Sequence, residues 1–318
     1  MNSNNKTNWI RVSKIHPCPV CGRPNWCLIA DDGKAAICQR IESNRHIKEA
    51  GFLHILVTGD FPISLCNQRQ QANQISRASA DILDKTYNQF LSALRLSACH
   101  KENLVMRGLS EPQIAVLKYR SIPSINRSLI ITRLTNCSVQ LSGIPGFWAD
   151  TENIWHFSGP VGIAIPVRDF MGRITGIQIR CDNVSGGKYK WFSSAGRMNG
   201  CGSGAMVHVS GSSITEIKEI WITEGPLKAD IASIKLKRKV LAVPGVASWS
   251  KVIPIIKNLN PESIVVAFDM DKVINQTVNF YRTQLINYLF KLGFEVYEAN
   301  WNNEFKGLDD ILATGELK

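Results

Sequence analysis

Acidic residues follow two apolar strand patterns in the last third of the chain. The run EIWIT leads into Glu224, and SIVVAFD ends in Asp269, with Asp271 two positions later. Carboxylates this close repel one another unless a cation shares them. Oxygen ligands without histidine favour Mg²⁺, which usually keeps waters and substrate phosphates in its remaining positions. These residues predict metal-assisted phosphoryl transfer on a nucleotide or a nucleic-acid backbone, although solvated acids at strand ends are the simpler alternative.

A parallel sheet is needed to bring these acids together. Strand patterns alternate with helix patterns from residue 219 onwards, which indicates a mostly parallel sheet with helices on both faces. The expected strands are EIWIT, VLAVP, SIVVAFD and EVYEANW, and the expected helices begin at Pro226 and cover 248–258 and 275–291. Functional groups in open α/β sheets gather at the carboxyl ends of the strands, so we expect the acids at one edge.

These acidic motifs resemble the Toprim domain, the catalytic core shared by bacterial-type primases, topoisomerases and some nucleases. The resemblance implies acid–base or metal chemistry for Glu224 and metal binding for Asp269 and Asp271. The later run KGLDD resembles a form seen in plasmid and phage primase–helicase proteins, and it implies a further Mg²⁺ or Mn²⁺ ligand. We take this ligand as Asp309, while the sequence leaves open whether Asp309 or Asp310 faces the metal.

Four cysteines near the start of the chain have metal-ligand spacing. Cys18 and Cys21 form a C-x-x-C pair backed by a glycine, and Cys27 and Cys38 follow. Four thiolates suit tetrahedral Zn²⁺, so we predict a structural zinc in a zinc ribbon, with His16 as the substitute ligand if one cysteine fails. The ribbon resembles the zinc modules that precede Toprim cores in primases and help to engage the template.

A basic, β-rich stretch lies between residues 160 and 210, with six basic residues against two acids. Charges alternating with the rings of Tyr189, Trp191 and Phe192 predict a groove for single-stranded DNA, although a strand pair with a basic solvent face is the alternative. The run GRITGIQIR resembles a strand that lines the catalytic groove of primases. The glycine-rich run after residue 193 is expected to be a loop over the groove. The candidate nucleic-acid ligands are Arg168, Arg173, Arg180, Lys188, Lys190, Trp191 and Arg197.

The composition and net charge of the chain indicate its class of partner and its compartment. The chain has 318 residues, 44% hydrophobic and 20% charged, with a net charge of +11 and a pI of about 9.3. The positive charge suits a polyanionic partner. No run has the length of a membrane span and no signal peptide is visible, so we expect a cytoplasmic protein without membrane contact. Nine cysteines, four of them clustered, favour a metal site with free thiols over disulfides.

The parts occur in the order found in bacterial-type primases, and we predict an α/β fold with a Toprim core. The expected domains are a zinc ribbon (1–60), a polar linker (61–79), a helical module (80–123), a basic α+β subdomain (124–215) and a Toprim domain (216–318). The implied function is primer synthesis from nucleoside triphosphates on single-stranded DNA, for a plasmid, phage or other mobile element. The alternatives are a Toprim nuclease and a non-catalytic DNA-binding or loading factor. Without a Walker motif, a separate replicative helicase is expected.

Overall fold

The structure, a computed structural model, divides the chain into two compact units, 1–71 and 72–318. It describes residues 8–56 except 32, 44, 48 and 49, residues 75–269 except 186, and residues 276–314 except 303 and 306. Most of the predicted linker, 61–79, therefore lies outside the described residues. Over these ranges no helix combines the length and the apolar character that crossing a bilayer requires.

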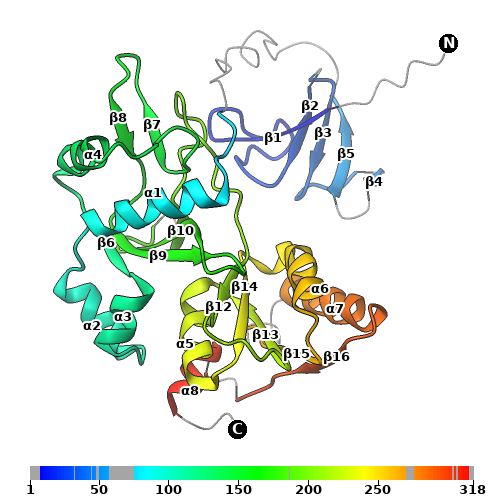
Figure 1. The fold of residues 1–318 in the computed structure, drawn as a ribbon. Coiled ribbons are helices and arrows are strands. Elements are labelled where there is room, and N and C mark those ends of the chain that lie inside the picture. Colours follow the sequence, from blue (N-terminus) through cyan, green and yellow to red (C-terminus); the bar gives the residue numbers. More distant parts are fainter. Residues whose placement is uncertain are drawn as a thin grey trace. The chain divides into compact units, whose positions relative to one another are not determined.

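The smaller unit is an antiparallel sheet of short strands (Figure 1). Its core contains the buried side chain of Val12 and three buried thiols, those of Cys18, Cys27 and Cys38. So little apolar area is typical of domains that need a metal or a disulfide to fold. The strand order is β1-β2-β3-β5-β4, with β1 Trp9–Arg11, β2 Leu28–Ala30, β3 Ala35–Cys38, β4 His46–Ile47 and β5 Gly51–Ile55.

The larger unit begins with helices where the periodicity predicts them: α1 Ala80–Ala93, α2 Ala98–Met106 and α3 Glu111–Leu117. Helix α1 buries Leu83, Tyr87, Phe90 and Leu91 on one face, as expected for apolar residues at helical spacing. Helix α3 starts with a capping box, because the Ser110 hydroxyl accepts from the Gln113 N–H and the Gln113 side-chain oxygen accepts from the Ser110 N–H.

A four-stranded antiparallel sheet follows, in the order β11-β10-β9-β6. One face packs on α1 and on α4, a helix that the sequence analysis did not predict, and the other face packs on α3 and α5. The predicted helical module thus shares its cores with the β-rich segment that follows it, and a boundary at residue 123 stays a prediction. The elements are β6 Arg120–Ile122, α4 Arg127–Asn136, β7 Phe147–Ala149, β8 Trp155–Phe157, β9 Gly162–Arg168, β10 Ile174–Cys181 and β11 Tyr189–Trp191.

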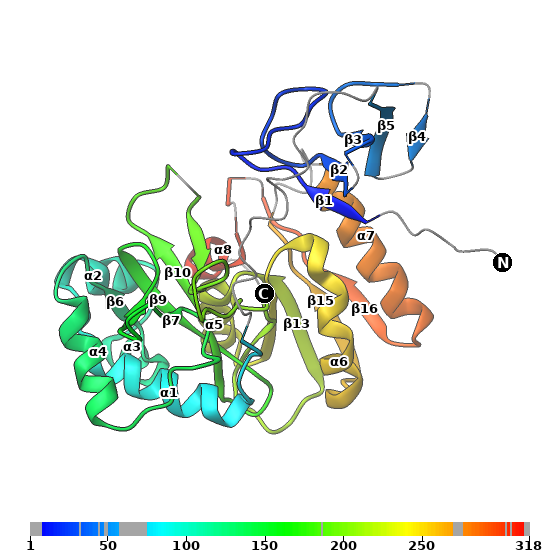
Figure 2. The same ribbon diagram turned by 90° about the horizontal axis from the view of Figure 1, so that it is seen from above.

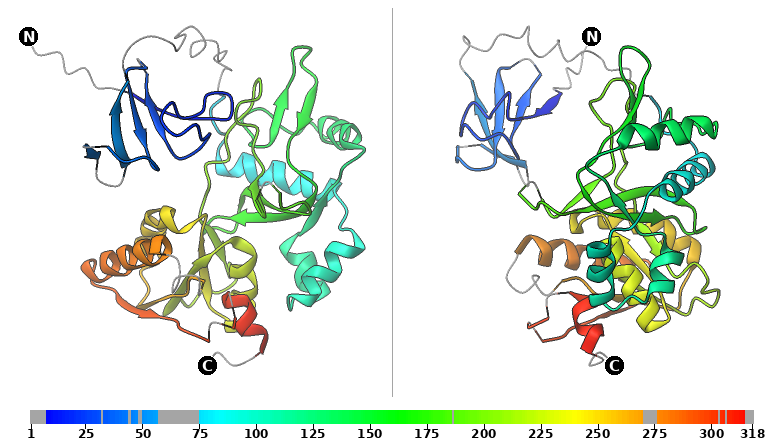
Figure 3. Two further views of the ribbon diagram at one scale, coloured as in Figure 1. Left: turned by 180° about the vertical axis from the view of Figure 1, so that it is seen from behind. Right: turned by 90° about the vertical axis from the view of Figure 1, so that its left-hand side faces the viewer.

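The last part is a five-stranded sheet in the order β12-β14-β13-β15-β16. All neighbours are parallel except β12, the edge strand formed by the end of the glycine-rich run. Helices α6 and α7 cover one face and α5 and α8 the other (Figure 2), and α8 lies beside α5 (Figure 3). The elements are β12 His208–Ser210, β13 Glu219–Glu224, α5 Pro226–Leu236, β14 Lys239–Val243, a 3-10 segment Val246–Val252, α6 Ile253–Leu259, β15 Ser263–Val266, α7 Gln276–Lys291, β16 Glu295–Glu298 and α8 Leu308–Thr314. The predicted α/β fold class is confirmed.

An aromatic cluster fills the core under α1. The Phe90 and Phe192 rings stack with centroids 5.2 Å apart, and Phe147 meets Phe90 edge-on at the same distance. Phe192 is fully buried here, so the expectation that its ring faces nucleic acid is wrong. Gly146 has a φ of +96° beside this ring, and a Cβ there would lie 2.1 Å from the Phe192 Cε1 atom.

We therefore predict that Gly146→Ala destabilises the protein more than Gly187→Ala. Both glycines have a positive φ, but a Cβ at Gly187, whose φ is +104°, meets nothing closer than 4.0 Å. Backbone strain is common to the two variants, so the difference reports the clash, about 1–3 kcal/mol in the free energy of unfolding. Denaturant unfolding measures it. Equal losses would mean that the Phe192 ring moves aside without cost.

Candidate functional site

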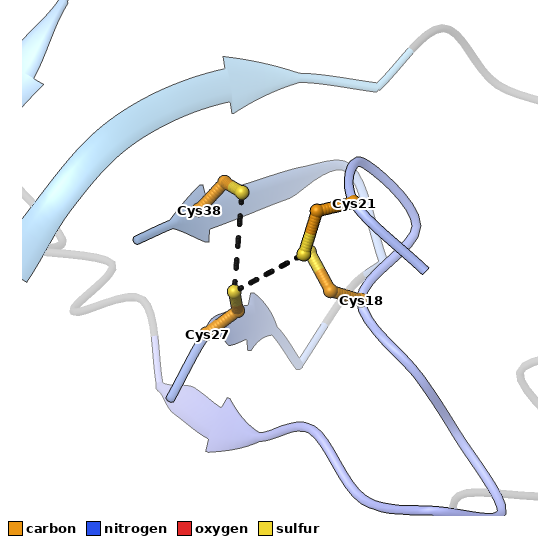
Figure 4. Close-up of side chains that lie close together, drawn as sticks. All are labelled: Cys18, Cys21, Cys27 and Cys38. Carbon is orange, nitrogen blue, oxygen red and sulfur yellow. Dashed lines mark hydrogen bonds between the residues drawn. The ribbon is translucent and has the colours of Figure 1, made fainter. Parts of the chain in front are cut away.

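The four predicted zinc ligands come together in the smaller unit (Figure 4). Cys18 and Cys21 lie in a tight turn, Cys27 directly precedes β2, and Cys38 ends β3. Their sulfur atoms all lie within 4.8 Å of one another, with 3.7 Å between Cys21 and Cys27 and 3.9 Å between Cys27 and Cys38. Tetrahedral Zn²⁺ with Zn–S bonds of about 2.3 Å requires sulfur–sulfur distances of about 3.8 Å. The cluster fits a structural zinc, and His16 is not part of it.

The surroundings of the thiols shift the pKa values of Cys27 and Cys21 in opposite directions. Burial raises the pKa of the Cys27 thiol to about 12, so this side chain binds its proton tightly without a cation. Burial also raises the pKa of Cys21, but hydrogen bonds from the Arg23 N–H and the Arg40 guanidinium outweigh it, and the pKa falls to about 6. The backbone N–H groups of Gln39 and Ile41 donate to sulfur at 3.4 and 3.3 Å.

In the larger unit, the acids lie at the carboxyl edge of the parallel sheet. Glu224 is the last residue of β13, and Asp269 follows β15 by three residues. Both line one cavity of about 230 Å³. Asp271 lies outside the described residues, so its position stays a prediction. The lining residues come from β10, β11 and the edge of the five-stranded sheet: Gln178, Tyr189, Glu224, Gly225, Leu227, Lys228, Val243, Pro244, Gly245 and Asp269.

Lys228 neutralises one of these acids. It lies one helical turn beyond Glu224 on α5, and its ammonium forms an ion pair with the Asp269 carboxylate. Only 20% of the Lys228 side chain and 13% of the Asp269 side chain are exposed, so the pair is screened weakly by solvent. Lys228 is therefore part of the cavity wall, and not a solvated residue on a helix face.

Asp309 and Asp310 differ in their environment. Asp309 is 4% exposed and pairs with Arg107, the residue after α2, whereas Asp310 is exposed and accepts the Gly307 N–H at 3.1 Å. A Cβ on Gly307 would lie 2.7 Å from Asp309 Oδ1 and 3.1 Å from Lys228 Nζ, so both side chains approach this glycine. Among the described residues, the Cys cluster is the sole group of three or more side chains spaced to share a metal.

The predicted nucleic-acid ligands differ in their exposure and in their partners. Arg173 pairs with Asp169 at 2.7 Å and Asp81 at 2.9 Å, and these carboxylates raise the pKa of its guanidinium. Lys190 is exposed, and Trp191 is half-buried beside it on β11. Lys188 is exposed and lies 5.9 Å from the Tyr189 ring, while the exposed Arg197 lies 5.2 Å from the Trp148 ring. Arg180 is half-buried on β10.

Arg168 belongs to a buried polar network. Its guanidinium donates to the Leu117 carbonyl at 2.7 Å, and its backbone N–H donates to His208 Nδ1 at 3.0 Å. His208 Nε2 then donates to Asp230 at 3.0 Å, and Tyr119 donates to the same carboxylate at 2.5 Å. Burial raises the pKa of Asp230, but His208 and Arg168 outweigh this effect and hold it below the ordinary value. Arg168 thus joins β9 to α5 inside the molecule.

Two residues at the acidic edge escaped the sequence analysis. Arg107 lies 202 positions before its partner Asp309, and no local pattern connects them. Gln178 lies in the cavity wall with 6% of its surface exposed. A signal for Gln178 exists in the sequence, because it lies between Ile177 and Ile179 in the mostly apolar run ITGIQI.

The fold with these two centres is similar to that of solved primase cores and of a primase zinc-binding domain. The zinc-binding and RNA polymerase domains of the Aquifex aeolicus primase share it at 13% identity and a TM-score of 0.60, over 99% of this chain and 77% of that one. The RNA polymerase domain of Mycobacterium tuberculosis DnaG matches at 11% identity and a TM-score of 0.58, over 76% and 83%. A DnaG catalytic domain bound to single-stranded DNA matches at 13% and 0.53, over 79% of each chain.

Sequence comparisons add one match. A family model described as a domain of unknown function, DUF3854, covers residues 214–317, which include the five-stranded sheet from β13 onwards. A search of curated proteins finds no match. The predicted resemblance to primases with an N-terminal zinc module is confirmed at the level of the fold.

We predict that the purified protein binds one zinc per chain and that zinc removal unfolds the smaller unit. The ion replaces the cost of bringing four thiols together and supplies folding free energy to a unit with a small core. Elemental analysis checks the content, with Cys18→Ser plus Cys21→Ser as the test and Cys99→Ser plus Cys137→Ser, two exposed thiols, as the control. Equal zinc in both double variants would contradict the assignment.

Proposed function

We propose that this chain is a primase-type nucleotidyltransferase that makes short primers on single-stranded DNA. The observation that supports it most is the position of Glu224, Lys228 and Asp269 around one cavity, on a fold similar to primase zinc-binding and RNA polymerase domains. We infer that the five-stranded sheet is a Toprim domain. The mobile-element setting and the partner helicase stay predictions from the sequence.

The charges of the cavity suit a triphosphate and a divalent ion. Glu224 and Asp269 line one space, so they fit Mg²⁺ or Mn²⁺, with Asp271 and Asp309 as further proposed ligands. A bound ion would neutralise charge on the transferring phosphoryl group. Lys228 Nζ lies in the same wall and adds a positive charge for the phosphates. Glu224 would accept a proton from the attacking hydroxyl, and Leu227, Val243 and Pro244 supply apolar surface in the same cavity.

We propose that the template contacts the exposed basic residues of the predicted set. Lys188 and Lys190 flank Tyr189 on the same strand as Trp191, and Arg197 follows. Chains of lysine and arginine beside rings bind single strands by phosphate contact and stacking. The DnaG domain bound to single-stranded DNA has a similar fold, which supports this assignment.

The acids should be required for chemistry and dispensable for DNA binding. Glu224→Gln keeps the shape of the side chain and removes its charge, so we expect primer synthesis to fall by about 10²-fold or more with little change in melting temperature. Asp269→Asn should also abolish synthesis, and it should lower the melting temperature because Lys228 loses a buried partner. The double variant Asp269→Asn plus Lys228→Met should regain stability and stay inactive.

The assay combines the full chain, single-stranded DNA, the four nucleoside triphosphates and Mg²⁺ or Mn²⁺, with products separated by size. New oligonucleotides that disappear in Glu224→Gln support a primase. Shortened DNA would identify the nuclease alternative. DNA binding without either product, with both metals, would contradict the proposal and favour the binding factor.

The exposed basic residues should carry the salt dependence of DNA binding. Lys188→Ala, Lys190→Ala and Arg197→Ala together should weaken binding and lower the slope of log affinity against log salt, because fewer counterions are released. Trp191→Ala should cost roughly 1–3 kcal/mol if its ring stacks on a base. Arg173→Ala is the matched control, since that guanidinium already binds two carboxylates. A greater loss of slope in the control than in the triple variant would place the groove elsewhere.

A further inference from the structure

Gln178 is a polar residue whose neighbours along and across the strand are apolar. On β10, Ile177 and Ile179 enter the core under α1, while Gln178 faces the opposite side with Ile165 as its cross-strand neighbour. Its side chain is 6% exposed and lines the cavity that contains Glu224, Lys228 and Asp269. Within the described part of the chain, its Oε1 atom has no hydrogen-bond partner.

A buried amide oxygen without a partner destabilises the folded state, whereas leucine at the same place would pack without that cost. Packing therefore does not explain a glutamine at this position. The orphaned oxygen lies on the wall of a cavity large enough for a ligand group, so a ligand is the partner that the site lacks.

The cavity has two kinds of wall. Glu224, Lys228 and Asp269, all from the five-stranded sheet and its first helix, present charges. Gln178 and Tyr189, from the four-stranded sheet, present neutral hydrogen-bonding groups. At about 230 Å³ the cavity is smaller than typical small-molecule pockets, about 300–1,000 Å³. A nucleotide with its phosphates at the charged wall would bring the sugar that adjoins them to the neutral wall beside Gln178.

The chemistry of the amide matches a sugar hydroxyl. A carboxamide oxygen accepts from an O–H donor, and its NH₂ group donates to a second hydroxyl oxygen, but neither charge nor stacking is offered. A site that pairs a buried acceptor with a substrate hydroxyl disfavours the analogue without it, because the acceptor is then left unpaired.

We propose that Gln178 binds the 2′-hydroxyl of the incoming nucleoside triphosphate and makes the site select ribonucleotides over 2′-deoxyribonucleotides. This inference rests on the proposed primase function and specifies the substrate class of the same site. Tyr189, the other neutral residue, borders the sugar from β11.

The test is equilibrium binding of ATP and 2′-deoxy-ATP to the full chain with Mg²⁺ and single-stranded DNA. The parent protein should bind ATP more tightly, and Gln178→Leu should remove the preference by weakening ATP about two- to tenfold with no change for 2′-deoxy-ATP. Gln178→Glu keeps an acceptor and should keep the preference while weakening both nucleotides, because its charge repels the phosphates. Thr175→Val is the matched control: it removes another buried, unpartnered oxygen on β10 that does not line the cavity.

The outcomes separate this inference from the function on which it rests. A melting temperature of Gln178→Leu equal to or above that of the parent shows that the variant is folded. Equal affinity of the parent for both nucleotides, or a preference that survives in Gln178→Leu, overturns the role of Gln178 and leaves the nucleotide site standing. Loss of the preference in Thr175→Val overturns it as well. A parent protein that binds neither nucleotide overturns both proposals.

Discussion

Charge compensation at the carboxyl edge of β13 and β15 is the constraint around which the larger unit is arranged. A parallel sheet brings Glu224 and Asp269 to one place, and carboxylates there repel one another in a site with little solvent. Two cations compensate the acids: Lys228 of α5 pairs with Asp269, and Arg107, directly after α2, pairs with Asp309. Lys228 lies on α5 and Arg107 directly follows α2, both outside the sheet, so the site is complete only when the N-terminal helices, the sheet and α8 are packed together.

The four-stranded sheet is covered on both faces at β9 and β10. One face packs on α1 and α4 and the other on α3 and α5, and β9 is buried at almost every position. Strands buried on both sides have continuous apolar runs, and GIAIPV is such a run. The sheet thus acts as a wall against α5, and Gln178 and Tyr189 reach the cavity of the acids from it.

The network around Asp230 fixes the same contact by polar means. His208, Ser210 and Tyr119 all bond to its carboxylate, and Ser210 donates at 2.6 Å. A buried charge with this many partners is stable only in one arrangement, because the loss of any partner leaves it uncompensated. Asp230 lies two residues after Lys228 on α5, so the network also orients the helix that carries the lysine to Asp269. Arg168, a predicted nucleic-acid ligand, is part of this network, because its backbone N–H donates to His208.

The sequence by itself determined the features that depend on local pattern. Alternating strand and helix periods predicted the parallel sheet and its acidic edge, and cysteine spacing predicted the thiol cluster, because backbone geometry and metal coordination act over short distances along the chain. Only the tertiary structure decided which of these residues face one another. Phe192 enters the core while its neighbour Trp191 stays half exposed, Arg173 is engaged by Asp81 from another element, and Arg107 reaches Asp309 across 202 positions. Side-chain direction and ion pairing between distant segments depend on how the elements pack, and no residue type or spacing encodes that locally.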